Sequence, residues 1–155
     1  MTDVQTAPAA PTIIHRADYQ PPDWLVPQIA LDFQLDPATT KVTAKFTVER
    51  QGAHDRPLRL DGEGLVPLAI RVDGIDADER TWDIDAGNIV ITLPGSSHVI
   101  ETIIEISPQS NSQLMGLYAS GGLLCTQCEA QGFRRITFFP DRPDVLSTYL
   151  VRMEA

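Results

Sequence analysis

The sequence is poor in the residues that stabilise secreted and metal-binding scaffolds. It has only two cysteines, Cys125 and Cys128, and three histidines in 155 residues. Two cysteines are too few for the disulfide framework of a small secreted domain, which favours a reducing compartment. The first residues carry neither the positive charge nor the apolar stretch of an export signal. No apolar run approaches the ~20 residues of a membrane-spanning helix, so we expect a cytoplasmic chain.

Positive charge is also scarce. Lys and Arg number 12 against 21 Asp and Glu, which gives a formal net charge of -9, and the basic residues are scattered along the chain. Such a surface repels phosphate backbones and anionic lipids. Nucleic acids and membranes are therefore not expected as partners.

Helical periodicity is absent, whereas short alternating stretches of apolar and polar residues are frequent. The clearest are residues 28–36 and 42–49, which flank turn-forming residues and predict a hairpin. Similar short runs, separated by clusters of Gly, Pro, Asp and Asn, occur at 58–60, 65–72, 81–84, 89–93 and 99–106. Many short strands at close spacing predict an all-β fold, antiparallel and saddle- or sandwich-like, with almost no helix beyond a turn near residues 142–146.

The alternation also predicts which side chains form the core. The candidates are Phe33, Leu35, Phe46, Val48, Ile91, Leu93, Ile104 and Ile106. Residues 1–18 are expected to be a flexible N-terminal tail, because the composition there is of low complexity. The folded domain is expected to span residues 19–155, beginning with the proline-fixed extended segment 19–23.

The last residues, 148–155, are strand-like, with Tyr149, Val151 and Met153 on one face. Native domains rarely end inside a strand. We therefore expect the chain to be the front part of a longer polypeptide, with the domain incomplete at its C-terminal end. An edge strand of this kind should be partly exposed.

Residues 114–144 concentrate Gly, Cys, aromatic and charged side chains, as functional loops often do. Cys125 and Cys128 have the C-x-x-C spacing of thiol-redox and zinc sites. A redox site needs a βαβ setting, and a structural zinc site needs two further ligands at short spacing; neither is visible. We expect reduced cysteines that pack as small apolar groups, with a thiol-redox protein as an alternative that a low thiol pKa would reveal.

The same segment places a carboxylate near an amide. If residues 125–129 are extended, Cys125, Gln127 and Glu129 share one face of the strand. Such a pair could bind a primary ammonium, the carboxylate through a charge-assisted hydrogen bond and the amide oxygen as a second acceptor. An exposed Glu without any binding role has the same spacing. No nucleophile–base pair, phosphate-binding loop or His-Glu-x-x-His sequence is present, so no complete catalytic apparatus is visible.

Several strings of consecutive residues add to this pattern: Gly116-Leu117-Tyr118, Leu124-Cys125-Thr126-Gln127-Cys128-Glu129-Ala130, Gly132-Phe133-Arg134 and Asp141-Arg142-Pro143-Asp144-Val145-Leu146. Together with Pro57-Leu58-Arg59-Leu60 and Ile106-Ser107-Pro108, they resemble bacterial aminopeptidase N, of the M1 zinc metallopeptidase family. The resemblance runs from about Tyr19 to the last residue. It implies a β-rich, saddle-shaped first domain with one loop that reaches into the active site of a following thermolysin-like domain.

The resemblance also implies roles for particular residues. Gln127 and Glu129 would line the pocket for the first residue of a peptide substrate, and Glu129 would bind its free α-amino group. The partners would be peptide substrates and the downstream catalytic domain of the same polypeptide, which would hold the zinc. The family's Gly-Ala-Met-Glu-Asn and His-Glu-x-x-His sequences do not occur in these residues. We therefore expect the chain alone to be inactive and free of zinc; the alternative function is a stand-alone β-sandwich binding module.

Overall fold

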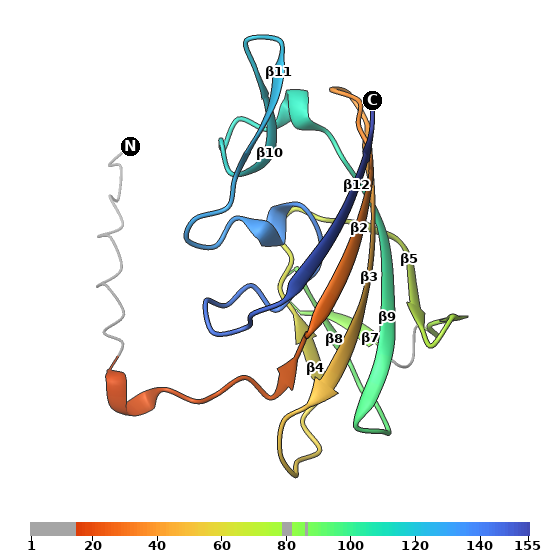
Figure 1. The fold of residues 1–155 in the computed structure, drawn as a ribbon, viewed down its shortest axis with the longest axis vertical. Coiled ribbons are helices and arrows are strands. Elements are labelled where there is room, and N and C mark those ends of the chain that lie inside the picture. Colours follow the sequence, from red (N-terminus) through yellow and green to blue (C-terminus); the bar gives the residue numbers. More distant parts are fainter. Residues whose placement is uncertain (1–14, 79–81, 86) are drawn as a thin grey trace, which may run out of the picture.

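The computed structural model describes residues 15–78, 82–85 and 87–155, and its regular structure is almost entirely β (Figure 1). Most of the predicted flexible tail, residues 1–14, lies outside the described residues. The strands are β1 (Trp24–Leu25), β2 (Gln28–Gln34), β3 (Thr40–Arg50), β4 (Leu58–Leu60), β5 (Pro67–Val72), β6 (Ile75–Asp76), β7 (Trp82–Asp85), β8 (Asn88–Ile91), β9 (Ser97–Ile106), β10 (Gly116–Ser120), β11 (Leu123–Gln127) and β12 (Thr148–Glu154). Three single 3₁₀ turns complete the described elements: η1 (Arg16–Asp18), η2 (Pro108–Ser110) and η3 (Phe133–Arg135).

The largest sheet has seven strands in the order β12-β2-β3-β9-β5-β6, with β1 paired to β3. The predicted hairpin is formed by β2 and β3, in which Ile29 lies opposite Phe46. Between them, the Asp36 side chain accepts hydrogen bonds from the backbone N–H groups of Ala38 and Thr39, at 2.8 and 2.9 Å. This is the local turn chemistry that Asp favours. The all-β prediction is confirmed, and the antiparallel pairing holds throughout this sheet except at one edge.

At that edge, β12 pairs with β2 in parallel, which differs from the predicted antiparallel arrangement. Parallel neighbours need a long crossover connection. Here the chain leaves β9, forms the β10–β11 hairpin and then crosses the core before it enters β12. The N–H of Thr148 donates to the carbonyl of Pro27 at 2.9 Å, so β12 begins beside the start of β2. The alternation of apolar and polar residues predicts which face of a strand is buried. It does not predict whether the strand is parallel or antiparallel to its neighbour.

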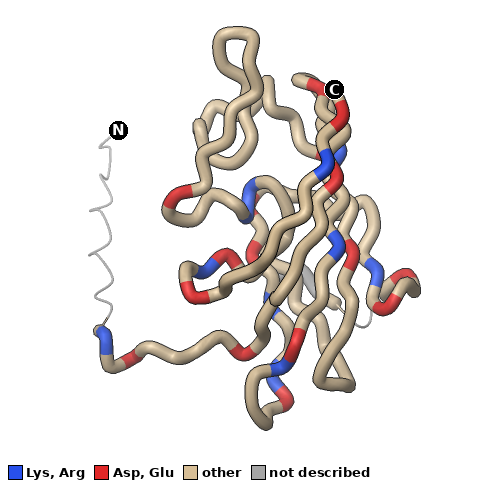
Figure 2. Tube along the Cα trace, in the orientation of Figure 1, with Lys and Arg blue, Asp and Glu red and all other residues tan. Residues whose placement is uncertain are grey.

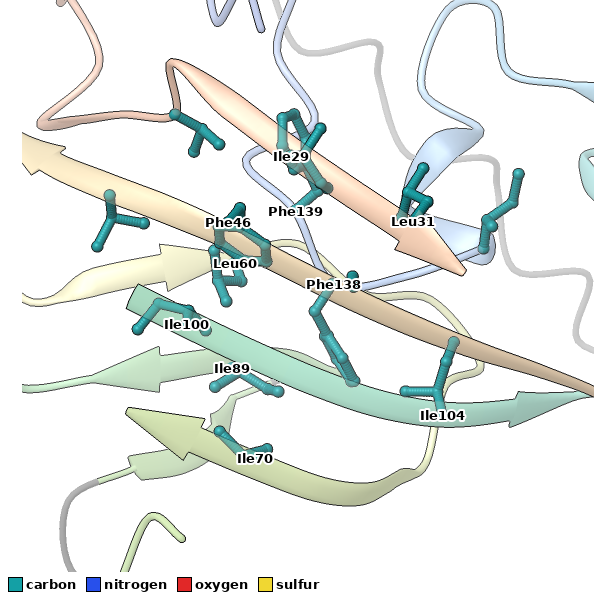
Figure 3. Packing of buried hydrophobic residues seen from close by; sticks show 14 of the residues in the cluster. Ile29, Leu31, Phe46, Leu60, Ile70, Ile89, Ile100, Ile104, Phe138 and Phe139 are labelled. Atoms are coloured by element: carbon teal, nitrogen blue, oxygen red, sulfur yellow. The ribbon is translucent and has the colours of Figure 1, made fainter. Parts of the chain in front are cut away.

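The core lies between the seven-stranded sheet and a second layer, which consists of the three-stranded sheet β4-β8-β7 and residues 133–145. Figure 3 shows Phe138 and Phe139, from that crossing segment, among apolar side chains of the large sheet. Most of the predicted core is buried: Phe33, Phe46, Val48, Ile91, Leu93 and Ile104. Leu35 and Ile106 are only partly buried, because they lie at strand ends where the second layer covers them incompletely.

Charged residues of both signs are interspersed along the folded chain (Figure 2). Arg152, for example, forms ion pairs with Asp32 and Glu154, at 2.7 Å each. Among the described residues, Lys and Arg do not line up along one face. That nucleic acids and membranes are not partners stays a prediction. None of the described residues form a helix that is long and apolar enough to span a bilayer.

The segment before β1 is tied to the loop before β12 by Arg142 and Asp144. Arg142 donates from Nε and Nη2 to the two carboxylate oxygens of Asp144, at 2.8 and 2.7 Å. The Tyr19 hydroxyl donates to the same carboxylate at 3.1 Å, and Arg142 also donates to the carbonyl of Gln20 at 2.8 Å. The hydrogen bonds from Arg142 and, to a smaller extent, from Tyr19 lower the pKa of Asp144 to about 2.

We expect this contact to make stability depend on pH in acid. Folding lowers the pKa of Asp144 from 3.8 to about 2, so its stabilisation is present above pH 3.8 and lost as the pH falls toward 2. The Asp144→Asn variant should therefore have a lower Tm than the wild type near neutral pH, and the difference should shrink as the pH approaches 2. Thermal unfolding followed by circular dichroism at a series of pH values measures this. Asp18→Asn, at an exposed position, is the control, and a Tm difference for Asp144→Asn that is constant with pH would contradict the expectation.

Candidate functional site

The residues that the sequence singled out lie at the base of the β10–β11 hairpin, which projects from the body of the domain (Figure 1). The strands pair with Gly116 opposite Gln127 and Ser120 opposite Leu123. Gly121 and Gly122 form the two-residue turn, with φ of 57° and 83°. Tight hairpin turns require these left-handed conformations, which glycine adopts without steric cost.

Glu129 lies in the turn that follows β11 and not on the strand itself. The strand ends at Gln127, and the chain then turns through residues 128–132. The N–H of Gly132 closes this turn by donating to the carbonyl of Cys128 at 2.8 Å. The extended conformation assumed for residues 125–129 is therefore wrong beyond Gln127, because alternation between faces stops where a strand ends.

The turn nevertheless keeps the two predicted site residues together. The Gln127 Nε2 donates to the backbone carbonyl of Glu129 at 3.4 Å, a long hydrogen bond. Both side chains are exposed. The Gln127 amide nitrogen can only donate hydrogen bonds, so the amide oxygen is the atom that can accept one from a ligand.

Two glycines allow the turn to pack closely against the base of the hairpin. A Cβ on Gly132 would lie 2.5 Å from the carbonyl oxygen of Gln127 and 2.8 Å from the Cα of Cys128. Gly116 has a φ of 74°, and a Cβ there would lie 2.7 Å from the Cβ of Arg135. Since larger residues at either position would displace the backbone, these glycines determine where Glu129 is held.

A network of charged groups holds the other end of the turn. The backbone N–H and Nε of Arg134 both donate to Asp141 Oδ2, at 3.1 and 3.0 Å, and Arg134 Nη2 donates to the Asp141 carbonyl at 3.0 Å. The N–H of Asp141 in turn donates to Asp61 Oδ2 at 3.0 Å. The Arg134 and Asp141 side chains are only 20% and 12% exposed. Breaking charge-assisted hydrogen bonds between partly buried groups costs free energy. The network therefore keeps the backbone of the turn that carries Glu129 in a fixed position.

A groove of about 400 Å³ adjoins the turn at Gln131 and does not include Glu129. It carries both signs of charge, and several of its charged groups already pair with each other, as Arg134 and Asp141 do. The lining consists of Pro22, Asp23, Trp24, Pro57, Arg59, Asp61, Gln131, Arg134, Pro140, Asp141 and Arg142. The groove is therefore a neighbour of the predicted site and not the site itself.

The two cysteines are both free and partly buried. Burial, with a smaller effect from the charge of Asp141, raises the pKa of the Cys128 thiol. A thiol-redox centre needs the opposite shift. Cys128 packs against the hydrophobic core, in keeping with the packing role expected from the sequence. In the part of the chain that the structure describes, no group of three or more His, Cys, Asp or Glu side chains could hold a metal ion.

The arrangement thus presents a carboxylate and an amide oxygen to solvent from one turn. Glu129 belongs to none of the ion pairs among the described residues. A primary ammonium has three donors, and a carboxylate beside an amide oxygen can accept two of them. A site of this kind could bind a cation, and among the described residues it has no cluster of metal-ligating side chains.

The sequence is similar to those of known proteins and matches one protein family. The family described as the peptidase M1 N-terminal domain matches residues 18–155. The chain is 46% identical over 145 residues to aminopeptidase N of Caulobacter vibrioides and 43% identical over 145 residues to aminopeptidase N of Escherichia coli, and each alignment covers 94% of this chain. It spans only 17% and 16% of the length of these relatives.

Solved structures share the fold of this chain. The fold matches that of Legionella pneumophila aminopeptidase A, solved in complex with aspartic acid, with a TM-score of 0.80 and 26% identity over 88% of this chain and 16% of that one. An M1 zinc metallopeptidase from Deinococcus radiodurans shares the fold with a TM-score of 0.70 at 21% identity, over 84% of this chain and 32% of that one. The resemblance seen in the sequence is confirmed, and the chain belongs to the family of peptidase M1 N-terminal domains.

Proposed function

We propose that this chain is the N-terminal domain of a zinc-dependent aminopeptidase, which removes N-terminal amino acids from peptides, and that it supplies part of the site for the substrate's α-amino group. The observation that carries the proposal is the family match over residues 18–155, combined with the exposed position of Glu129 beside Gln127. Since the chain spans 17% of the length of its relative from Caulobacter vibrioides, we place the catalytic residues elsewhere in a longer polypeptide, after a β-domain formed by residues 19–155.

In this proposal, Glu129 acts as an anchor. Its carboxylate accepts a charge-assisted hydrogen bond from the α-ammonium group of the peptide. Holding that group at one place fixes the position of the first peptide bond and excludes later bonds from the reacting centre. The amide oxygen of Gln127 contacts the ammonium or the side chain of the first residue. Neither residue takes part in bond breaking, so both are substrate-binding residues.

We propose further that this chain binds no zinc of its own. The described residues contain no cluster of metal ligands, and the raised pKa of Cys128 disfavours the thiolate that zinc binds. His54 and His98 are already engaged: His54 Nε2 lies 2.9 Å from the carbonyl of Asp23, and His98 Nδ1 lies 2.8 Å from a carboxylate oxygen of Asp73. We propose that zinc is held by other parts of the polypeptide. The two free cysteines support the further proposal of a cytoplasmic enzyme.

The Glu129→Gln substitution in the full-length enzyme tests the anchor. It removes the negative charge and keeps the shape of the side chain, so we expect kcat/KM for alanyl and lysyl anilides to fall by roughly ten- to a thousandfold. Zinc content and Tm should be unchanged, because the side chain is exposed and is not a metal ligand. Gln127→Ala should have a smaller effect, mainly on which N-terminal residues are accepted.

Glu49→Gln is the matched control, since Glu49 is also exposed and the change in charge is the same. Its kcat/KM should equal that of the wild type. If Glu129→Gln retained wild-type kcat/KM as well, the carboxylate would be a solvated loop residue and the proposed role would be wrong.

The 155-residue chain on its own provides a second test. Because its described residues contain no metal-ligand cluster, we expect no hydrolysis of aminoacyl anilides and no stoichiometric zinc after dialysis, as measured by elemental analysis. One zinc ion per chain would contradict this and return attention to Cys125 and Cys128. A full-length reading frame without a metallopeptidase catalytic sequence would instead favour a stand-alone binding module.

A further inference from the structure

The 3₁₀ turn η3 (Phe133–Arg135) begins immediately after the turn that carries Glu129, and a glycine precedes it. Gly132 occupies the N-cap position, where Ser, Thr, Asp or Asn usually accepts a hydrogen bond from one of the first backbone N–H groups. Glycine has no side chain that could do so. A larger residue does not fit there, because its Cβ would lie 2.5 Å from the carbonyl oxygen of Gln127. The close packing of the turn therefore leaves η3 without a cap of its own.

Asp141 supplies this cap from a later part of the chain. Its Oδ2 accepts a hydrogen bond from the backbone N–H of Arg134 at 3.1 Å. Arg134 is the second residue of η3, a position whose N–H an N-cap side chain commonly binds. The same oxygen accepts from Arg134 Nε at 3.0 Å, and the Asp141 carbonyl accepts from Nη2 at 3.0 Å. One carboxylate thus holds both the backbone and the side chain of Arg134.

Backbone hydrogen bonds connect this cap to Glu129. The N–H of Arg135 donates to the carbonyl of Gly132 at 3.1 Å, and the N–H of Gly132 donates to the carbonyl of Cys128 at 2.8 Å. The capped η3 and the turn before it are therefore one hydrogen-bonded unit. Asp141 also acts on the start of that turn, since burial and, to a smaller extent, the Asp141 charge raise the pKa of the Cys128 thiol. A displacement at Asp141 would be transmitted to the backbone of Glu129.

The two carboxylates differ in their surroundings. The Asp141 side chain is only 12% exposed, and its N–H donates to Asp61 Oδ2 at 3.0 Å, so the residue is held on both its side chain and its backbone. Glu129 is exposed. Asp141 is therefore suited to fixing the turn, whereas Glu129 is suited to meeting a ligand from solvent.

We propose that Asp141 is a positioning residue for the substrate's α-amino group. It does not contact the substrate. By capping η3 it keeps the turn, and with it the Glu129 carboxylate, at the place where the ammonium group is bound. This inference rests on the proposed function of Glu129 and adds a second carboxylate that acts only through the first.

The Asp141→Ala substitution in the full-length enzyme removes the cap. A displaced anchor holds the ammonium group less well, so we expect kcat/KM for alanyl anilides to fall by about tenfold, at unchanged zinc content. Asp141→Asn should retain more activity, because the amide keeps an oxygen that can accept both hydrogen bonds from Arg134. Asp36→Ala is the matched control: Asp36 also accepts backbone N–H bonds, in the β2–β3 turn, so its loss should lower Tm and leave kcat/KM unchanged.

A double-mutant cycle tells positioning from a general loss of structure. In the Glu129→Gln background, Asp141→Ala should change kcat/KM by less than about twofold, because the anchor that Asp141 positions is already gone. A loss of folded enzyme would instead lower kcat/KM by the same factor in both backgrounds. If Asp141→Ala prevents folding, Asp141→Glu takes its place in the cycle, since it keeps the charge but moves the carboxylate away from the Arg134 N–H.

Each outcome of the cycle decides between the proposals. An equal fall in both backgrounds would overturn the positioning role, because Asp141 would then act independently of Glu129. Wild-type kcat/KM for Asp141→Ala, with a reduced value for Glu129→Gln, would overturn it as well and would leave the proposed function intact. Wild-type kcat/KM for Glu129→Gln would overturn the proposed function itself.

Discussion

The candidate site depends on one packing interaction, that of residues 136–139, in the second layer of the core, against the large sheet. Phe138 is completely buried, and it lies so close to Gly62 that a Cβ there would be 2.2 Å from the Phe138 ring. Phe139 forms a two-way backbone pair with Asp61, through hydrogen bonds of 2.9 and 3.2 Å. These contacts fix Asp61 beside Asp141 and Arg134, and that network fixes the end of the turn that carries Glu129. The position of the surface turn that carries the Glu129 carboxylate thereby depends on packing in the core.

Under the proposed function, this arrangement allows a surface turn of the domain to hold a substrate for an enzyme. The turn formed by residues 128–132 is exposed on one side, and on the other it is held by close glycine contacts and by the partly buried ion pair of Arg134 and Asp141. A binding residue needs such support, since the benefit of holding a substrate in one geometry is lost when the holding group moves. Under the proposed function, the chain provides a positioned anchor for the substrate, and residues elsewhere in a longer polypeptide carry out the reaction.

The regular part of the fold was predictable from the sequence because β2, β3 and β9 each have one buried face, and burial imposes a period of two. Three features were not. The parallel direction of β12 depends on how the chain crosses the core, which alternation does not encode. Phe138 was missed as a core residue because it lies outside any strand. The β10–β11 hairpin was not predicted as such, although Gly121-Gly122 between two apolar runs was the available signal.

For the site itself, the spacing of residues was compatible with Glu129 as a binding residue and with Glu129 as an ordinary surface residue. The predicted extended segment was also too long, because β11 ends at Gln127. The assignment came from the resemblance, not from geometry. The most direct test is a crystal structure of the full-length protein with a bound free amino acid, measuring the distance from the ligand's ammonium nitrogen to the Glu129 carboxylate. The account predicts a hydrogen bond of about 2.6–3.2 Å. A Glu129 side chain in solvent, with the ammonium group held by other residues, would contradict it.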